Sequence, residues 1–226
     1  MSTNSGFAKF LRFIGIVLMA LTGGFTLLGG VGTSCAALAP TNYDSMAALA
    51  PFQWLYILFV LIGVALGVMG IRATIMLVKG ADKSYRDAMV ALIAGVVVGF
   101  IHIAMSRSLR GSSMPVDAVV YTTVLTLIVF LIFKIPAIWQ GVDFAKAKAN
   151  KNKPAAGASA ILLGILTLTI QFTMGATHTW DGVNYADAFN ASMTGVGLGL
   201  LLLGVAIIIP WEMLRQSRRR VLSLSK

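Results

Sequence analysis

The sequence has few of the side chains on which catalysis and metal binding depend. Its 226 residues include one cysteine, two histidines and eight aspartates and glutamates in total. Cys35 is alone, so it has no partner for a disulfide within the chain. The patterns Gly-x-Ser-x-Gly and His-Glu-x-x-His, typical of serine and zinc hydrolases, are both absent. The sequence therefore favours a protein that is not an enzyme, and it predicts no catalytic residue and no metal site other than the cofactor ligand considered below.

Charged residues are also scarce, at 12% of the chain against 58% hydrophobic residues. Soluble globular proteins carry about twice that share of charge. The charged residues are bunched, and the stretches between them are long enough to cross a bilayer, which takes about 20 apolar residues as a helix. This pattern excludes a soluble enzyme, a nucleic-acid-binding domain and a disordered chain, despite the net charge of +10.

We therefore predict an all-α, polytopic membrane protein in which residues 1–226 form a single integral membrane domain with six transmembrane helices. The predicted spans are 13–32, 52–71, 88–105, 116–133, 156–174 and 192–210. The first is retained as a span because its apolar run exceeds the roughly 7–15 residues of a cleaved signal peptide.

The basic residues predict the orientation of the helices. With six spans both termini lie on one side, and every lysine and arginine except Arg107 and Arg110 falls on that side. Cytoplasmic segments of membrane proteins carry an excess of basic residues. We therefore expect both termini in the cytoplasm and the protein in a plasma membrane, that is, a cytoplasmic or inner membrane. The run Arg218-Arg219-Arg220 then serves as an anchor for anionic lipids, and nucleic acid is not an expected partner.

Two further features concern the organisation of the chain. Similar phrases, such as TNYD at 41–44 and VNYAD at 183–187, suggest three repeated helical hairpins, although apolar segments also resemble each other by composition alone. Residues 135–153 form a cytoplasmic segment whose apolar side gives way to lysines. This favours an interfacial helix followed by a basic linker, with a kinked continuation of the fourth span as the alternative.

Apart from His102, the polar residues in the central turns of the spans are limited to hydroxyl and amide side chains. His102 is the only histidine in a predicted span and the one candidate ligand for a haem or a pigment metal. A polar path for a neutral solute would use Thr122, Thr126, Thr167 and Gln171, whereas back-bonding to their own helices is the alternative for the threonines. Beyond a ligand of His102, no cofactor other than lipids is expected.

Small residues recur at helical spacing in three spans and predict close helix packing. The glycine pairs are Gly63 and Gly67, Gly95 and Gly99, and Gly195 and Gly199. They fit contacts within this chain or docking to another membrane subunit or to a second copy of the chain.

Three functions remain open on these grounds. The first is a non-catalytic membrane subunit that packs, anchors or stabilises a larger complex. The second is a transport protein for a small neutral or amphipathic solute, either a channel or a permease that works with a separate ATPase. The third is a redox or pigment-binding subunit that uses His102.

Overall fold

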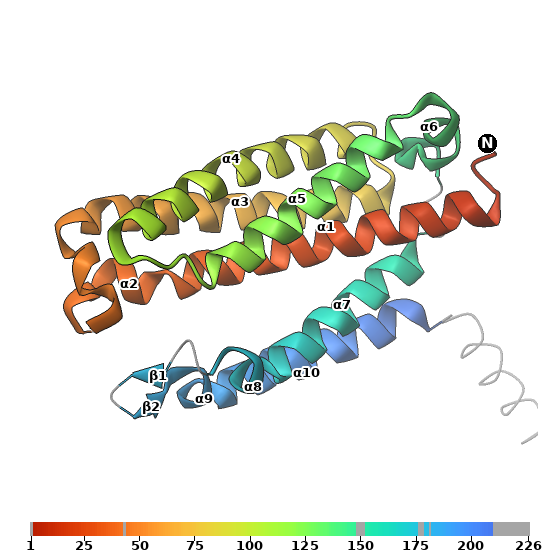
Figure 1. The fold of residues 1–226 in the computed structure, drawn as a ribbon. Coiled ribbons are helices and arrows are strands. Elements are labelled where there is room, and N and C mark those ends of the chain that lie inside the picture. Colours follow the sequence, from red (N-terminus) through yellow and green to blue (C-terminus); the bar gives the residue numbers. More distant parts are fainter. Residues whose placement is uncertain (1, 43, 148–151, 176–178, 181, 210–226) are drawn as a thin grey trace, which may run out of the picture.

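The computed structural model describes residues 2–42, 44–147, 152–175, 179–180 and 182–209 (Figure 1). The described chain is almost entirely helical, with one small antiparallel pair of two-residue strands between residues 179 and 184. The helices are α1 (Gly6–Gly32), α2 (Ser34–Leu38), α3 (Gln53–Lys79), α4 (Ser84–Arg110), α5 (Val116–Phe133), α6 (Pro136–Val142), α7 (Lys153–Leu168), α8 (Ile170–Met174), α9 (Tyr185–Ala188) and α10 (Asn190–Ile208). The strands are β1 (Thr179–Trp180) and β2 (Val183–Asn184), and short 3₁₀ helices cover η1 (Pro40–Asn42), η2 (Asp44–Phe52) and η3 (Phe144–Lys146).

Five helices of the described chain are long and apolar enough to cross a membrane, namely α1, α3, α4, α5 and α10. This confirms an all-helical protein whose composition suits multiple passes. The predicted span 156–174 is not one continuous helix, because α7 ends at Leu168 and the short α8 follows. At the break, the hydroxyl of Thr169 donates to the carbonyls of Ile165 (3.0 Å) and Leu166 (3.2 Å), and such bonds compete with regular helix bonding.

Local signals explain where several helices begin and end. The hydroxyl of Ser5 accepts a hydrogen bond from the backbone N–H of Ala8 and caps the first turn of α1. Gly80 and Gly111 follow α3 and α4 with φ angles of 67° and 71°, which only glycine adopts without strain. Pro136 stands in the first turn of α6, where its missing N–H costs nothing. These residues fix the turns that reverse the chain.

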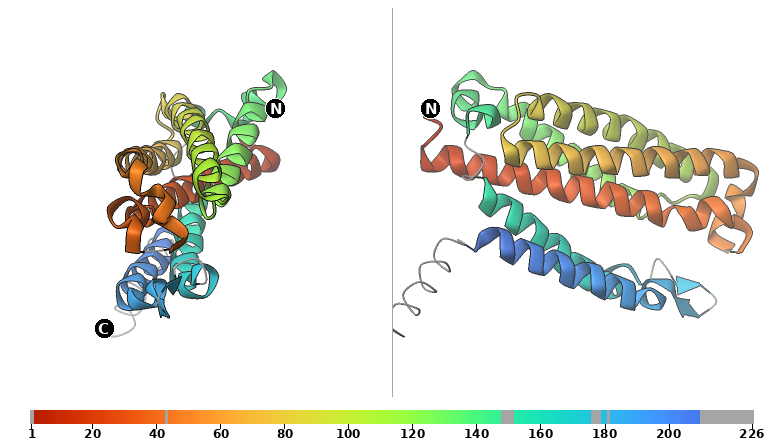
Figure 2. Two further views of the ribbon diagram at one scale, coloured as in Figure 1. Left: turned by 60° about the vertical axis from the view of Figure 1, so that its left-hand side comes forward. Right: turned by 180° about the vertical axis from the view of Figure 1, so that it is seen from behind.

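The helices α1, α3, α4 and α5 pack into a bundle, and α7 and α10 form a separate hairpin beside α1. Both views of Figure 2 show this hairpin as its own layer, joined to the bundle through α7 rather than α10. The amino end of α1 lies near α6, whereas α2, β1 and β2 lie toward the opposite end of the molecule (Figure 1). The end with α6 is called the inner end below, after the predicted orientation.

The main core of the bundle lies near this inner end. Side chains of α1, α3, α4 and α5 meet there with those of α6 and η3, and Phe130, Phe133 and Phe144 are almost fully buried. The rings of Phe130 and Phe144 stack with centroids 6.2 Å apart. The segment after α5 is thus a separate helix, α6, whose end at Val142 is buried against the bundle. A second, smaller core around Tyr56 and Phe59 closes the outer end.

Candidate functional site

His102, the candidate ligand, is buried between α3 and α4. Its ring stacks on Phe59 with centroids 4.2 Å apart and an interplanar angle of 13°, and Tyr56 packs edge-on at 5.5 Å. The hydroxyl of Tyr56 lies 2.8 Å from that of Ser106, one turn along α4. Phenylalanine therefore covers one face of the imidazole, and the cluster joins the outer ends of the two helices. The histidine side chain is 9% exposed.

A polar network holds the turn between α4 and α5 just beyond this cluster. The hydroxyl of Ser113 donates to both carboxylate oxygens of Asp117, at 2.8 and 2.9 Å. Arg107 donates to the Ser113 hydroxyl from Nε at 2.9 Å and to Asp117 from Nη2 at 3.3 Å. Ser113 and Asp117 are both buried, so the network satisfies a carboxylate that would otherwise be costly to desolvate. The sequence analysis did not identify this network, which the serine four residues before Asp117 could have indicated.

The threonines and the glutamine of the predicted polar path do not gather into one row among the described side chains. Thr126 is fully buried, and its hydroxyl lies 2.7 Å from that of Thr22 on α1. The hydroxyls of Thr122 and Thr167 donate to the carbonyls four residues earlier in their own helices. The side chain of Gln171 lies outside the described residues. A hollow beside Thr22 measures about 10 Å³, roughly the room for a single water.

Glycine contacts are the most extensive feature of the helix packing. A Cβ added to Gly67 would lie 2.6 Å from Cα of Leu27, and one added to Gly63 would lie 3.1 Å from Cα of Gly30. These contacts join α3 to α1. In the α4–α5 pair the contacts are with side chains, since Gly95 lies against Thr123 and Gly99 against Val120.

Glycines hold the hairpin of α7 and α10 together, but the glycines of α10 that do so are not the pair predicted from the sequence. A Cβ on Gly204 would lie 2.7 Å from the carbonyl oxygen of Gly157, and one on Gly164 would lie 2.8 Å from that of Gly197. The selected residues, Gly195 and Gly199, have no atom within 4 Å of an added Cβ. At about 100° of rotation per residue, they point away from the side of α10 that meets α7.

Close contacts between glycines also join α1 to α3, and the spacing of these glycines was visible in the sequence. Gly23 lies against Gly70, and Gly30 lies against Gly63, so each helix contributes two glycines seven residues apart. In the second hairpin the paired residues are also seven apart on both helices. A search for glycines at this spacing on two consecutive spans would have found both contacts.

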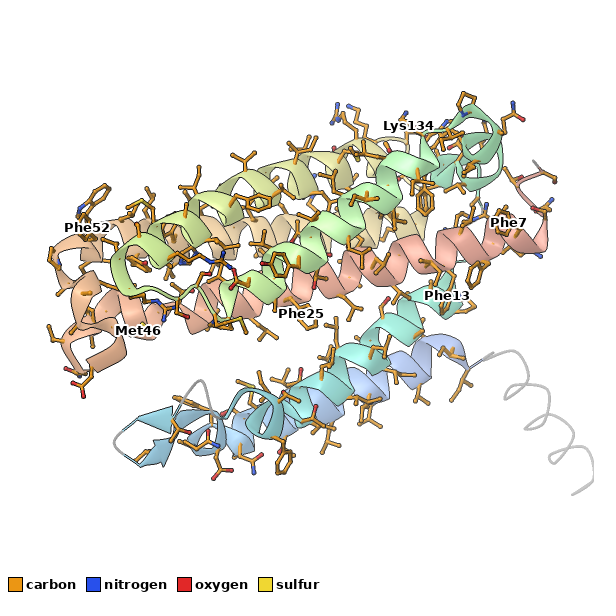
Figure 3. All side chains as sticks on the ribbon, in the orientation of Figure 1. Phe7, Phe13, Phe25, Met46, Phe52 and Lys134 are labelled. Atoms are coloured by element: carbon orange, nitrogen blue, oxygen red, sulfur yellow. The ribbon has the colours of Figure 1, made fainter. Side chains whose placement is uncertain are left out.

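Two basic residues at the inner end have unusual surroundings. Arg12 is 1% exposed, and it donates to the carbonyls of Gly141 at 2.6 Å and Thr3 at 2.8 Å. Gly141 belongs to the last turn of α6, where helix carbonyls favour a cation. Lys134, labelled in Figure 3, lies over the rings of Trp139 (4.4 Å) and Tyr85 (4.8 Å). Both contacts hold α6 against the bundle.

The predicted lipid anchor at Arg218, Arg219 and Arg220 lies outside the described residues. Within the described chain, no group of three His, Cys, Asp or Glu side chains is placed to hold a metal ion. No protein-family model, curated protein or solved structure matches this chain. Its function must therefore be argued from its geometry alone.

Proposed function

We propose that the chain is a non-catalytic membrane subunit that packs against another membrane helix through α10. The observation that carries this proposal is the open glycine face of α10, formed by Gly195 and Gly199 with nothing within 4 Å of an added Cβ. Beside the two glycines on this face stands Leu202, which is 71% exposed. Small residues alternating with leucine allow two helix backbones to approach closely in lipid.

The position of α10 in the fold supports the same proposal. Its extensive contacts are with α7, and the bundle meets the hairpin mainly through α1 and α7. In the other hairpin, α3 is covered further by α4, and α1 is covered further by α5. The helix α10 therefore has room for a neighbour that the described part of the chain does not supply. The partner is another membrane protein or a second copy of the chain.

The experiment combines partner analysis with matched variants. Purification from native membranes followed by native mass spectrometry reports the assembly state and any stoichiometric partner. The double variant Gly195→Leu/Gly199→Leu should lose that assembly because leucine blocks close approach, while its helical circular dichroism stays unchanged. Ala104→Leu is the control, since Ala104 is a small exposed residue of α4. A wild-type protein that is monomeric and alone, or equal loss in the variant and the control, would refute the proposal.

We also propose that the inner end is cytoplasmic and that the membrane is a plasma membrane. The excess of basic residues at that end supports this orientation. In a Cys35→Ser background, Lys83→Cys and Ser112→Cys place thiols at exposed sites on opposite ends of α4. An impermeant maleimide added to intact cells should label residue 112 and spare residue 83. The reverse labelling, or labelling of both, would overturn the proposed topology.

Transport and cofactor binding remain alternatives without a supporting observation. A solute path needs connected polar space, and the hollow beside Thr22 has room for roughly one water. His102 is buried, and no second histidine lies in a predicted span to share the ligation of a haem. The open face of α10 therefore favours the subunit proposal over both.

A further inference from the structure

A second open feature lies on α3, near its inner end. An open hollow of about 510 Å³ is formed by six residues of this helix. They are Val68, Ile71, Arg72, Ile75, Met76 and Lys79. Their spacing of three and four residues places them on one side of the helix. The helix α1 packs on the opposite side, at Gly67 and Gly70, so the hollow faces away from α1.

The hollow lies at the depth of lipid phosphates. Trp54, which is 64% exposed, stands at the outer start of α3, and tryptophan favours the membrane interface. Arg72 follows 18 residues later, which is about 27 Å at the rise of an α-helix. The hydrocarbon layer is about 30 Å thick. If Trp54 marks one boundary, Arg72 marks the other, and Lys79 extends two turns further among the headgroups.

The two cations in the hollow have no acidic partner. Neither Arg72 nor Lys79 forms a hydrogen bond or an ion pair with a side chain or carbonyl of the described chain. Lys146, in contrast, pairs with Asp143 at 3.0 Å, and Arg12 donates to two carbonyls. The N–H donors of the Arg72 guanidinium are therefore not used within the described chain, and their planar arrangement suits a phosphate.

We infer that this hollow binds an anionic phospholipid, with its phosphate beside Ile75, between Arg72 and Lys79, and an acyl chain along Val68 and Ile71. Val68 and Ile71 are 54% and 37% exposed, and they lead from Arg72 toward the membrane centre, whereas Ile75, 48% exposed, lies between the two cations. A zwitterionic lipid would supply the acyl chain but would leave the two positive charges without net compensation. An apolar partner helix would leave both cations without a counter-ion. Anionic lipids are concentrated in cytoplasmic leaflets, the side proposed for this end of α3.

The test uses the full chain in nanodiscs that contain equal amounts of phosphatidylglycerol and phosphatidylcholine. After ejection in the mass spectrometer, wild-type protein should retain phosphatidylglycerol adducts in preference to phosphatidylcholine. Arg72→Gln/Lys79→Gln should lose that preference severalfold. Lys9→Gln/Lys83→Gln is the matched control, because it removes the same charge from two exposed basic residues of the inner end that lie outside the hollow.

Two further measurements distinguish a specific lipid-binding site from general electrostatic attraction. Ile75→Trp fills the hollow and keeps both cations, so it should also reduce retained phosphatidylglycerol. Added inorganic phosphate should not displace the lipid, since it lacks the acyl chain. Equal losses in the glutamine variant and its control would reduce the effect to general electrostatics. Unchanged retention in Arg72→Gln/Lys79→Gln, with every variant monodisperse and helical, would overturn the inference.

Discussion

Replacing Gly67 with alanine tests the close approach of α1 and α3 directly. The added Cβ would lie 2.6 Å from both Cα and N of Leu27 and 2.7 Å from its Cβ. Carbon atoms in good contact are about 3.5–4.0 Å apart. The obstacle is the backbone of α1, which cannot rotate away as a side chain could. The two helices must therefore separate by about 1 Å at this point.

The expected loss of stability follows from the van der Waals contacts that this separation weakens. A radial gap of about 0.5–1 Å forfeits a quarter to a half of each dispersion contact that it opens. Overpacking of a well-packed interior typically costs about 1–3 kcal/mol. Because α1 and α3 touch along most of their length, we expect Gly67→Ala to destabilise the protein by about 2–3 kcal/mol, near the upper end of that range.

Gly199→Ala is the matched control, because it makes the same substitution at an open helical position. Alanine is a better helix former than glycine by about 1 kcal/mol, so the control should be neutral or stabilising in the isolated chain. Stability is measured by unfolding in mixed micelles with increasing dodecyl sulfate, followed by circular dichroism. A Gly67→Ala protein as stable as wild type, or one no less stable than Gly199→Ala, would refute the close contact between α1 and α3.

Three further experiments test polar contacts, each by the same unfolding assay. Asp117→Ala should cost about 1–3 kcal/mol because it leaves the buried hydroxyl of Ser113 without its acceptor, and an unchanged midpoint would contradict the network in the α4–α5 turn. Arg12→Ala should lower the free energy of unfolding by about 3 kcal/mol, because two carbonyls lose their hydrogen-bond donor and a buried side chain is removed. Faster proteolysis after α6 should accompany this destabilisation. In a double-mutant cycle, Thr22→Val and Thr126→Val should show a coupling of about 0.6 kcal/mol, and additive effects would contradict their hydrogen bond.

Hydropathy predicted the helical class and most of the apolar segments, because long uncharged stretches record which residues lie in lipid. The predicted span 116–133 coincides with α5, which charged residues delimit at both ends. The helix α1 begins seven residues before the predicted span, since its start depends on the Ser5 cap and not on hydropathy. The break after Leu168 falls in a stretch without charged residues, where Thr167, Thr169 and Gln171 lie, so a prediction based on charge-free runs gave no sign of it.

The contacts of the candidate residues were harder to predict than their positions. Glycines four residues apart were a good guide in α3, where Gly63 and Gly67 both meet α1. In α10 the same spacing selects the side without a neighbour, whereas Gly197 and Gly204 make the contacts. A pattern within one helix defines a face, but it does not say which helix covers that face. Pairing information from two helices, such as the seven-residue spacing shared by partners, is needed for that step.

The glycines on the open side of α10 also indicate whether lipid or a partner protein covers this side. Glycine within a helix costs roughly 1 kcal/mol relative to alanine, and in the isolated chain Gly195 and Gly199 recover none of this through contacts. A surface that met only lipid would lose nothing if both were alanine or leucine. We therefore expect the sign of the effect to depend on the assembly: Gly199→Ala should leave the isolated chain at least as stable but weaken its association with the proposed partner helix. If the substitution leaves association unchanged as well, lipid covers this side of α10, and the two glycines have no role in packing.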